Sequence, residues 1–462
     1  MKKLLFILLT ASLILGFSSC SHKDIPNNAL TLIPQPQEMK VGADHFKLTR
    51  RAAITLDTSN PQLMGIARYF NNKVTSATGF EIPVEKHGNI EFKLTDDTAL
   101  SAEGYRLQVK HGDIIITAHQ PAGIFYGVQT LLQMLPPEIK SSREQKGTDW
   151  TIPCADITDK PQFAWRGLML DVSRHWFTKE EVKKYIDELA EYKMNVFHWH
   201  LTDDQGWRIE IKKYPKLTEI GSKRIDGEGT EYGGFYTQEE VKDIVKYAAD
   251  RFITIVPEIE LPGHEMAAIA AYPELSCEGK QGTPRIIWGV EDIVLCAGKE
   301  EPFQFFEDVI AEVAPLFPGE YFHIGGDECP KTSWEKCPLC QKRMKKQRLA
   351  NEEDLQGYFM KRISDYLRKK GREVIGWDEL TNSSFLPEES IILGWQGMGT
   401  AALKAAEKGH RFIMTPARVL YLIRYQGPQW FEPVTYFGNN TLKDVFDYEP
   451  VQKDWKPEYE SL

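Results

Sequence analysis

The stretch "GLMLDVSRHWFTKEEVKKYIDELAEYKMNVFHWHLTDD", residues 167–204, decides the fold because it holds a strand, a helix and a second strand in succession. Its two ends, "GLMLDVS" and "NVFHWHLTDD", are mostly apolar, as in strands covered on both faces. Its middle has helical periodicity, and Thr178 stands three residues before a glutamate, which is the signature of a capping box. This pattern predicts two parallel strands joined by a crossover helix.

The same alternation continues along residues 151–462. Five further strands are predicted at "ITIVPEIE", "YFHIGGDE", "EVIGWDEL", "SIILGWQG" and "RFIMTPA". Helices are predicted at "TQEEVKDIVKYAAD", "PFQFFEDVIAEVAPLF" and "EEDLQGYFMKRISDYLRKKG". Seven strands interleaved with helices favour an α/β fold of the TIM-type (β/α)8 barrel class over a doubly wound sheet. Because we count seven strands and not eight, we expect a barrel truncated before strand 8 and incomplete at its C-terminal end.

A small α/β domain is predicted ahead of the barrel, over residues 32–150. "AAITLD" and "DIIITA" have the composition of strands, and "PQLMGIARYFNNKVTSATG" predicts a helix that ends at Gly79. A second helix, "GIFYGVQTLLQML", is stopped by Pro136 and Pro137. The loop "KSSREQKGTDW" then leads into the barrel, which we expect to begin near Ile152.

The first twenty residues predict a targeting segment. Lys2 and Lys3 precede an apolar run, Leu4 to Phe17, that is too short to span a bilayer, and Cys20 follows two small residues. We interpret residues 1–20 as a lipoprotein-type signal peptide that leaves Cys20 lipidated, with an ordinary cleaved signal peptide as the alternative. Residues 21–31 form a polar tether. Both interpretations predict an exported protein, in the periplasm or on the outer membrane. Only the lipoprotein interpretation adds a membrane contact, through the lipid anchor at Cys20.

Composition restricts the class of partner. The 462 residues are 42% hydrophobic and 26% charged, which is typical of a globular protein. The net charge of −10 argues against a nucleic-acid partner. The chain has no P-loop and no G-x-S-x-G nucleophile elbow.

Polar and aromatic residues follow nearly every predicted barrel strand, where such barrels place their active sites. The strand ends read "HWHLTDDQGW", "PEIELPGH", "GGDE", "GWDE" and "GWQG". We interpret Trp199, Trp377 and Trp395 as a wall for a sugar ring, with core packing as the alternative for each. Asp327 and Glu328 stand side by side after Gly325 and Gly326, which suits either an acidic turn or a catalytic acid with a helper.

A metal is the first competing interpretation. Six side chains could be proposed as ligands: His198, His200, Asp203, Asp204, Glu258 and His264. No H-E-x-x-H helix or comparable spacing is present, so we expect no catalytic metal.

The cysteines suggest bonds or thiols rather than a metal. Cys329, Cys337 and Cys340 are only three, whereas a structural zinc site needs four ligands, so a disulfide or free thiols are favoured there. Cys277 and Cys296 flank a loop of eighteen residues, and we expect them to form a disulfide in an exported protein.

Six motifs together resemble glycoside hydrolase family 20, the β-N-acetylhexosaminidases, and with the targeting segment they suggest a bacterial, exported member. They include "RGLMLDVSRHW", "WHLTDDQGWR", "PEIELPGH", "HIGGDE" and "GWDE", and the resemblance runs from about Leu32 to the end of the chain. The resemblance implies an exo-acting hydrolase that releases terminal GlcNAc or GalNAc from an N-acetylated oligosaccharide or glycoconjugate, without a cofactor. Retention comes from the acetamido group of the substrate, which acts as the nucleophile.

The resemblance also implies roles for individual residues. Glu328 resembles the general acid, whose pKa we expect to be raised, and Asp327 the ionised helper that stabilises the oxazolinium intermediate. The remaining counterparts are His264 with Asp203 or Asp204 as a relay to the acid, Arg166 as the grip on the 3- and 4-hydroxyls, Trp377 and Trp395 as walls of the acetamido pocket, and Tyr421 as the donor to the acetamido carbonyl.

Two departures from the family pattern keep alternatives open. The family has an aspartate two residues after the tyrosine, where this chain has Ile423 and then Arg424. A basic residue there would favour a sulfated sugar, unless Arg424 faces solvent. The family's tryptophan motif on strand 8 has no counterpart before Leu462. The alternatives are therefore a non-catalytic or weakly active glycan-binding lipoprotein and, third, a two-carboxylate glycosidase.

Overall fold

The computed structural model describes residues 30–461 except 388, 436–437 and 454. The predicted signal peptide and Cys20 lie outside the described residues. The chain divides into two compact units, Met1–Gln162 and Phe163–Leu462, and each is described separately.

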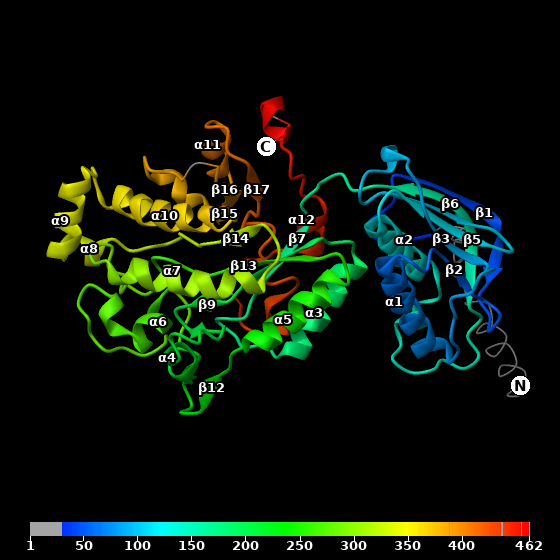
Figure 1. Ribbon diagram of the computed structural model, residues 1–462, viewed down its shortest axis with the longest axis horizontal. Coiled ribbons are helices and arrows are strands. Elements are labelled where there is room, and N and C mark those ends of the chain that lie inside the picture. The colour runs from blue at the N-terminus through cyan, green and yellow to red at the C-terminus, as the bar shows by residue number, and fades with distance from the viewer. Residues whose placement is uncertain (1–29, 388, 436–437, 454, 462) are drawn as a thin grey trace, which may run out of the picture. The chain divides into compact units, whose positions relative to one another are not determined.

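The N-terminal unit is a six-stranded sheet with the strand order β1-β6-β4-β5-β3-β2. Its helices α1 (Pro61–Thr78) and α2 (Pro121–Met134) contact each other and lie side by side in Figure 1. The predicted end of α1 is confirmed, because Gly79 caps it with a left-handed φ of 71°. The strands are β1 (Glu38–Lys47), β2 (Ile54–Thr55), β3 (Ile90–Leu94), β4 (Tyr105–Val109), β5 (Ile114–Ala118) and β6 (Thr151–Asp159).

The boundary between the units falls later than residue 150, where we expected it. Strand β6, Thr151–Asp159, pairs with β1 and β4 in the N-terminal sheet, so this segment belongs to the first unit. The sequence of β6 does not indicate which sheet this strand joins, because its partner β1 lies more than a hundred residues earlier in the chain.

The C-terminal unit is built on a seven-stranded sheet whose strands are all parallel and follow chain order, β7-β8-β13-β14-β15-β16-β17. All seven predicted strands are confirmed, and within the described residues the sheet is a TIM-type barrel that lacks an eighth strand. The strands are β7 (Gly167–Asp171), β8 (Val196–His200), β13 (Thr254–Glu258), β14 (Tyr321–His323), β15 (Glu373–Trp377), β16 (Ile391–Gly394) and β17 (Phe412–Met414).

Helices separate most of these strands, as the sequence predicts, and a 3-10 helix, η5 (Asp378–Asn382), lies between β15 and β16. Thr178 and Thr237 each form the expected capping box, which satisfies backbone N–H groups at the starts of α3 and α5. The helices of this unit are α3 (Lys179–Glu191), α4 (Lys216–Glu219), α5 (Gln238–Ala249), α6 (Met266–Ala271), α7 (Glu301–Val313), α8 (Thr332–Lys336), α9 (Pro338–Gln347), α10 (Glu352–Lys369), α11 (Ala402–Ala406) and α12 (Leu442–Phe446). The connection between β8 and α5 contains two short antiparallel pairs of strands: β9 (Thr202–Asp203) with β10 (Gly206–Trp207), and β11 (Lys223–Ile225) with β12 (Glu231–Gly233).

Buried apolar side chains from four strands, β8, β13, β15 and β16, form a core cluster: Val196, Val256, Ile375, Trp377, Ile391 and Leu393. Because the strands are parallel and adjacent in chain order, their carboxyl ends meet along one rim. Within the described part of the chain, no helix is both long and apolar enough to cross a membrane.

Candidate active site

The acidic pair lies on the rim, directly after the short strand β14. Gly325 and Gly326 have φ angles of 61° and 100°, and Glu328 itself has a φ of 45°. A side chain at Gly325 would not fit, since its Cβ would lie 1.7 Å from Oε2 of Glu260. This left-handed turn brings both carboxylates to one imidazole: His264 Nε2 lies 3.4 Å from Asp327 Oδ2 and 3.5 Å from Glu328 Oε2. Adjacent strand residues would point to opposite sides, so the glycines explain how both acids share one site.

His264 connects the pair to a buried carboxylate. Its Nδ1 lies 3.2 Å from Asp203 Oδ1 and 3.5 Å from Asp204 Oδ2. The Asp204 carboxylate accepts hydrogen bonds from the backbone N–H groups of Met266 and Glu291, at 3.0 and 3.1 Å. Asp204 is therefore committed to holding two loops, and the geometry favours Asp203 as the partner of His264.

Asp203 also joins the relay to two cationic groups. Arg174 NH2 and His200 Nε2 each lie 2.8 Å from Asp203 Oδ2. Burial would raise the pKa of Asp203, but the charge of Arg174 outweighs burial and holds that pKa far below its ordinary value. This carboxylate is thus a fixed negative charge behind His264.

The charges around the pair favour an ionised Asp327. Burial would lower the pKa of His264, but Asp203 and Asp327 raise it well above its ordinary value, so His264 is a cation near neutral pH. Burial in turn would raise the pKa of Asp327, but the charge of His264 holds that pKa below its ordinary value. The Glu328 side chain is 43% exposed, compared with 15% for Asp327. One carboxylate is therefore held ionised beside a cation, while its neighbour faces outward.

Glu258, at the end of β13, is buried and contacts several side chains, whereas the sequence indicated it only as a candidate metal ligand. His200 Nδ1 lies 2.5 Å from its Oε2, and Trp377 Nε1 donates to its Oε1 at 2.9 Å. His198 Nε2 and His323 Nδ1 lie 2.8 and 2.9 Å from the same carboxylate. Burial opposes the charge on His200, but Glu258 raises the pKa of His200 to about 10. Two triads here are compact enough to hold a metal ion, His198–Glu258–His323 and His200–Glu258–Glu260. The contacts of the three histidines with Glu258 give them a structural role without a metal.

Two of the three predicted tryptophans and the predicted tyrosine form one aromatic group on the rim. Trp377 and Trp395 meet edge to face with ring centroids 6.4 Å apart, and Trp395 stacks on Tyr421 at 6.1 Å and 16°. Burial, followed by the charge of Asp327, raises the pKa of Tyr421 well above its ordinary value, so its phenol keeps its proton. Trp199 does not join them, because it is fully buried between Phe197 and Tyr236 and packs in the core.

Glu379, which was not among the residues predicted for the site, holds this aromatic group next to the acidic pair. Its Oε2 accepts from Trp395 Nε1 at 2.9 Å, and its Oε1 accepts from the backbone N–H of Glu328 at 3.5 Å. Burial and then the charge of Asp327 raise the pKa of Glu379 to about 8. The motif "GWDE" was a usable signal, because its last residue follows the strand end by two positions.

Arg166 does not reach the site, so this assignment is wrong. It precedes β7 and therefore lies at the amino end of the sheet, where its Nε donates to Lys193 O and its NH1 to Phe163 O, both at 2.9 Å. Arg174 follows the carboxyl end of the same strand and pairs with Asp171 and Asp203 at 2.8 Å. Its side chain is 34% exposed, so Arg174 is the arginine that can meet a ligand here.

The predicted disulfide between Cys277 and Cys296 is wrong in this structure, because both cysteines are free. The eighteen-residue loop does bring them near each other, but Cys337 and Cys340 arrive at the same place. Sequence spacing could not predict this cluster. Helices α8 and α9 follow β14, which is the next strand along the chain after the loop that carries Cys277 and Cys296.

Comparison with family models divides the chain where the structure does. Residues 163–461 match the model of the catalytic domain of glycosyl hydrolase family 20, and residues 29–160 match the model of domain 2 of the same family. Together the two matches cover nearly all of the described residues.

Individual proteins agree with the family models. The chain is 47% identical over 454 residues to β-hexosaminidase of Porphyromonas gingivalis, a match that covers 96% of this chain and 58% of that protein. It is 35% identical to β-hexosaminidase of Vibrio furnissii over 94% of this chain and 70% of that one. A mutant Streptomyces plicatus β-hexosaminidase, solved in complex with its product GlcNAc, superposes with a TM-score of 0.81 at 35% identity, covering 91% of this chain and 81% of that chain.

Proposed function

Because the chain belongs to glycosyl hydrolase family 20, we propose that it is an exo-acting β-N-acetylhexosaminidase that releases terminal GlcNAc or GalNAc from glycans. One observation carries the proposal: Asp327 and Glu328 both lie within 3.5 Å of His264, and Trp395 and Tyr421 stack beside them. An ionised carboxylate, an outward carboxyl group and an aromatic wall are the groups that hydrolysis assisted by the substrate's acetamido group requires.

In the proposed reaction, the acetamido oxygen of the substrate attacks the anomeric carbon as the bond to the leaving oxygen breaks. Glu328 gives its proton to that oxygen, and its 43% exposure places it where an incoming glycan can reach it. Asp327 accepts the acetamido N–H and balances the positive charge of the oxazolinium intermediate. Water then adds to the anomeric carbon and loses its proton to Glu328, which regenerates both the acetamido group and the acid.

The surrounding residues position the substrate. Trp395 and Tyr421 would enclose the acetamido group, and the protonated phenol of Tyr421 can donate to its carbonyl oxygen. Fixing that oxygen over the anomeric carbon is proximity catalysis. Arg174 replaces Arg166 as the proposed grip on the sugar hydroxyls, because it lies at the correct end of β7.

The second candidate is a glycan-binding protein without appreciable turnover. An assay with an aryl N-acetyl-glucosaminide separates the two: turnover that depends on Glu328 supports the enzyme, whereas saturable binding without turnover supports the alternative.

Export and lipidation at Cys20 are proposed from the sequence alone. Labelling cells with palmitate tests them, with Cys20→Ser as the control that should lose the label. A soluble, unlabelled product would indicate an ordinary cleaved signal peptide. The preference for a sulfated sugar, which Arg424 would favour, is tested by comparing 6-sulfated and unsulfated aryl N-acetyl-glucosaminides in wild type and Arg424→Ala.

A further inference from the structure

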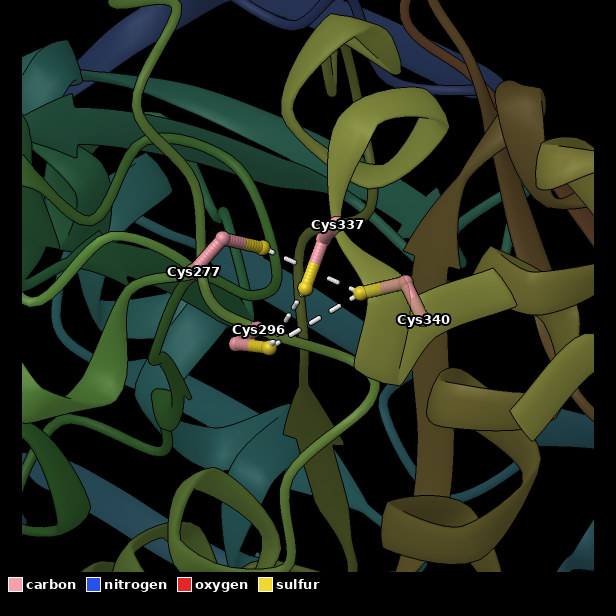
Figure 2. A group of neighbouring side chains, drawn as sticks. All are labelled: Cys277, Cys296, Cys337 and Cys340. Carbon is pink, nitrogen blue, oxygen red and sulfur yellow. Dashed lines mark hydrogen bonds between the residues drawn. The ribbon is translucent and has the colours of Figure 1, made fainter. Parts of the chain in front are cut away.

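Four cysteines from three separate segments of the chain lie close together, apart from the groups that include the acidic pair. Cys277 follows a short 3-10 turn, η3 (Pro273–Leu275), and Cys296 lies next to it because Ser276 and Leu295 form an antiparallel bridge. Cys337 and Cys340 begin helix α9 as a C-P-L-C knuckle. Figure 2 shows the four sulfur atoms directed toward a common centre. None of the four has a part in the proposed reaction.

Three of the sulfur–sulfur distances match the edge of a tetrahedron around one metal ion, and all four sulfur atoms lie within 4.8 Å of one another. Cys277 and Cys340 are 3.8 Å apart at sulfur, Cys296 and Cys337 are 3.9 Å apart, and Cys296 and Cys340 are 3.7 Å apart. A zinc–sulfur bond of about 2.3 Å gives a tetrahedral sulfur–sulfur edge of about 3.8 Å. A disulfide would instead need sulfur atoms about 2.0 Å apart.

The backbone after Cys296 turns tightly beside the cluster. The N–H of Lys299 donates to the carbonyl of Cys296 at 3.4 Å. Gly298 has no room for a side chain, since its Cβ would lie 2.3 Å from the backbone nitrogen of Cys340. The loop that carries Cys296 therefore packs directly on the knuckle that carries Cys340.

Two cations lie beside these loops. Lys299 Nζ donates to the carbonyl of Ser276 at 2.6 Å, next to Cys277. Arg343 NH2 donates to the carbonyls of Gly298 and Lys299 at 3.1 and 3.2 Å. A divalent ion with four thiolates carries a net charge of −2, so nearby cations would lower the cost of burying it. Cys296 and Cys340 are fully buried and Cys337 is 7% exposed, which makes an uncompensated charge there costly.

We propose that Cys277, Cys296, Cys337 and Cys340 bind one Zn²⁺ ion as a structural site. Four thiolates complete the tetrahedron and leave no position for water, so this ion has no part in hydrolysis. It would join the segment after β13, which carries His264, to the segment after β14, which carries Glu328. One hydrogen bond already joins these two segments, from Trp334 Nε1 to Leu295 O at 2.8 Å. A second, from Leu295 N to Pro262 O at 3.1 Å, connects Leu295 to the loop that carries His264.

The test uses the full chain, purified without chelator or added metal. We expect elemental analysis to find one zinc ion per chain in wild type, and loss of that ion in Cys296→Ala. Cys154→Ala is the matched control, because Cys154 lies in the N-terminal unit and should leave the zinc content unchanged. Wild type stripped of zinc with an organomercurial should rebind Co²⁺ with the visible absorption of a tetrahedral thiolate site.

The measurements on wild type keep the proposal testable even if Cys296→Ala fails to fold. Peptide mapping that finds Cys277 bonded to Cys340 and Cys296 bonded to Cys337 would overturn it. So would a folded wild type that contains no zinc and does not take up Co²⁺. Activity is not needed for either decision, so a failure here is distinguishable from a failure of the proposed hydrolase function.

Discussion

Gly325→Ala tests whether the left-handed turn after β14 is what places the two carboxylates. A side chain in that conformation costs about 1–2 kcal/mol. Its Cβ would also lie 1.7 Å from Glu260 Oε2, a buried carboxyl group that must then move. Forcing extra volume into a packed site costs about 1–3 kcal/mol. The free energy of unfolding should therefore fall by about 2–5 kcal/mol.

Gly371→Ala is the matched control for this loss of stability. Gly371 has a φ of 73°, close to the 61° of Gly325, but nothing lies within 4 Å of the place its Cβ would take. This control should lose only about 1–2 kcal/mol, measured by urea unfolding of both variants under the same conditions.

Activity separates the two variants further. A displacement of about 1 Å in the acidic pair should lower kcat/KM on an aryl N-acetyl-glucosaminide by about 100-fold in Gly325→Ala. Gly371→Ala should keep the wild-type value, since it lies after α10, away from the rim. The reasoning fails if Gly325→Ala is no less stable than Gly371→Ala, or if it keeps full activity while folded.

Three other predictions concern the rim. Glu328→Gln should lose turnover of glycans with poor leaving groups by about 100-fold or more while sparing activated aryl glycosides, because only the former need a proton; equal losses would exclude Glu328 as the acid. Arg174→Ala should lower kcat/KM by about 10–100-fold, which is the value of a hydrogen bond to a charged group. Arg166→Ala should lower stability more than kcat/KM. The reverse result would support Arg166 as the residue that binds the sugar hydroxyls. Glu379, whose pKa is about 8 in the folded chain, takes up a proton on folding, so stability should fall as pH rises from about 4.3 to about 8. Glu379→Gln should flatten that part of the thermal-unfolding profile, and an unchanged profile would contradict the assignment.

The strands and helices of the barrel could be predicted because their signals are local. Apolar runs, helical periodicity and capping boxes at Thr178 and Thr237 depend on a few neighbouring residues, and the structure confirms them. The position of β6 could not be predicted in this way, because its partner β1 lies about a hundred residues earlier. Elements with local sequence signals could therefore be predicted, whereas the pairing of strands far apart in the chain could not.

The candidate site divides along the same line. The rim location of Asp327, His264 and Tyr421 follows from strand order, which the sequence predicts. The choice between Arg166 and Arg174 also needed only strand direction, because one precedes β7 and the other follows its carboxyl end. The positions of the two arginines relative to the strand were therefore enough to favour Arg174. The family motif contains both arginines and could not by itself decide between them.

Other features depend on long-range packing that no spacing reveals. Glu258 gathers side chains from β8, β14 and β15, and its role as a buried centre appears only when the sheet is assembled. The four-cysteine cluster likewise needs the loop after β13 to pack on α9. Cys329, Cys337 and Cys340 argued against zinc in the sequence, but only Cys337 and Cys340 join the cluster. The other two members, Cys277 and Cys296, come from segments about sixty and forty residues earlier in the chain.

The central claim is that the acetamido group of the substrate performs the nucleophilic attack. The most direct measurement compares kcat/KM of the full chain on an aryl N-acetyl-β-glucosaminide and on the matching aryl β-glucoside, which lacks the acetamido group. The account predicts turnover of the first at least about 1,000-fold faster than the second, because the nucleophile and its positioning are lost together. Comparable rates on both substrates, with Asp327→Asn leaving the ratio unchanged, would contradict it.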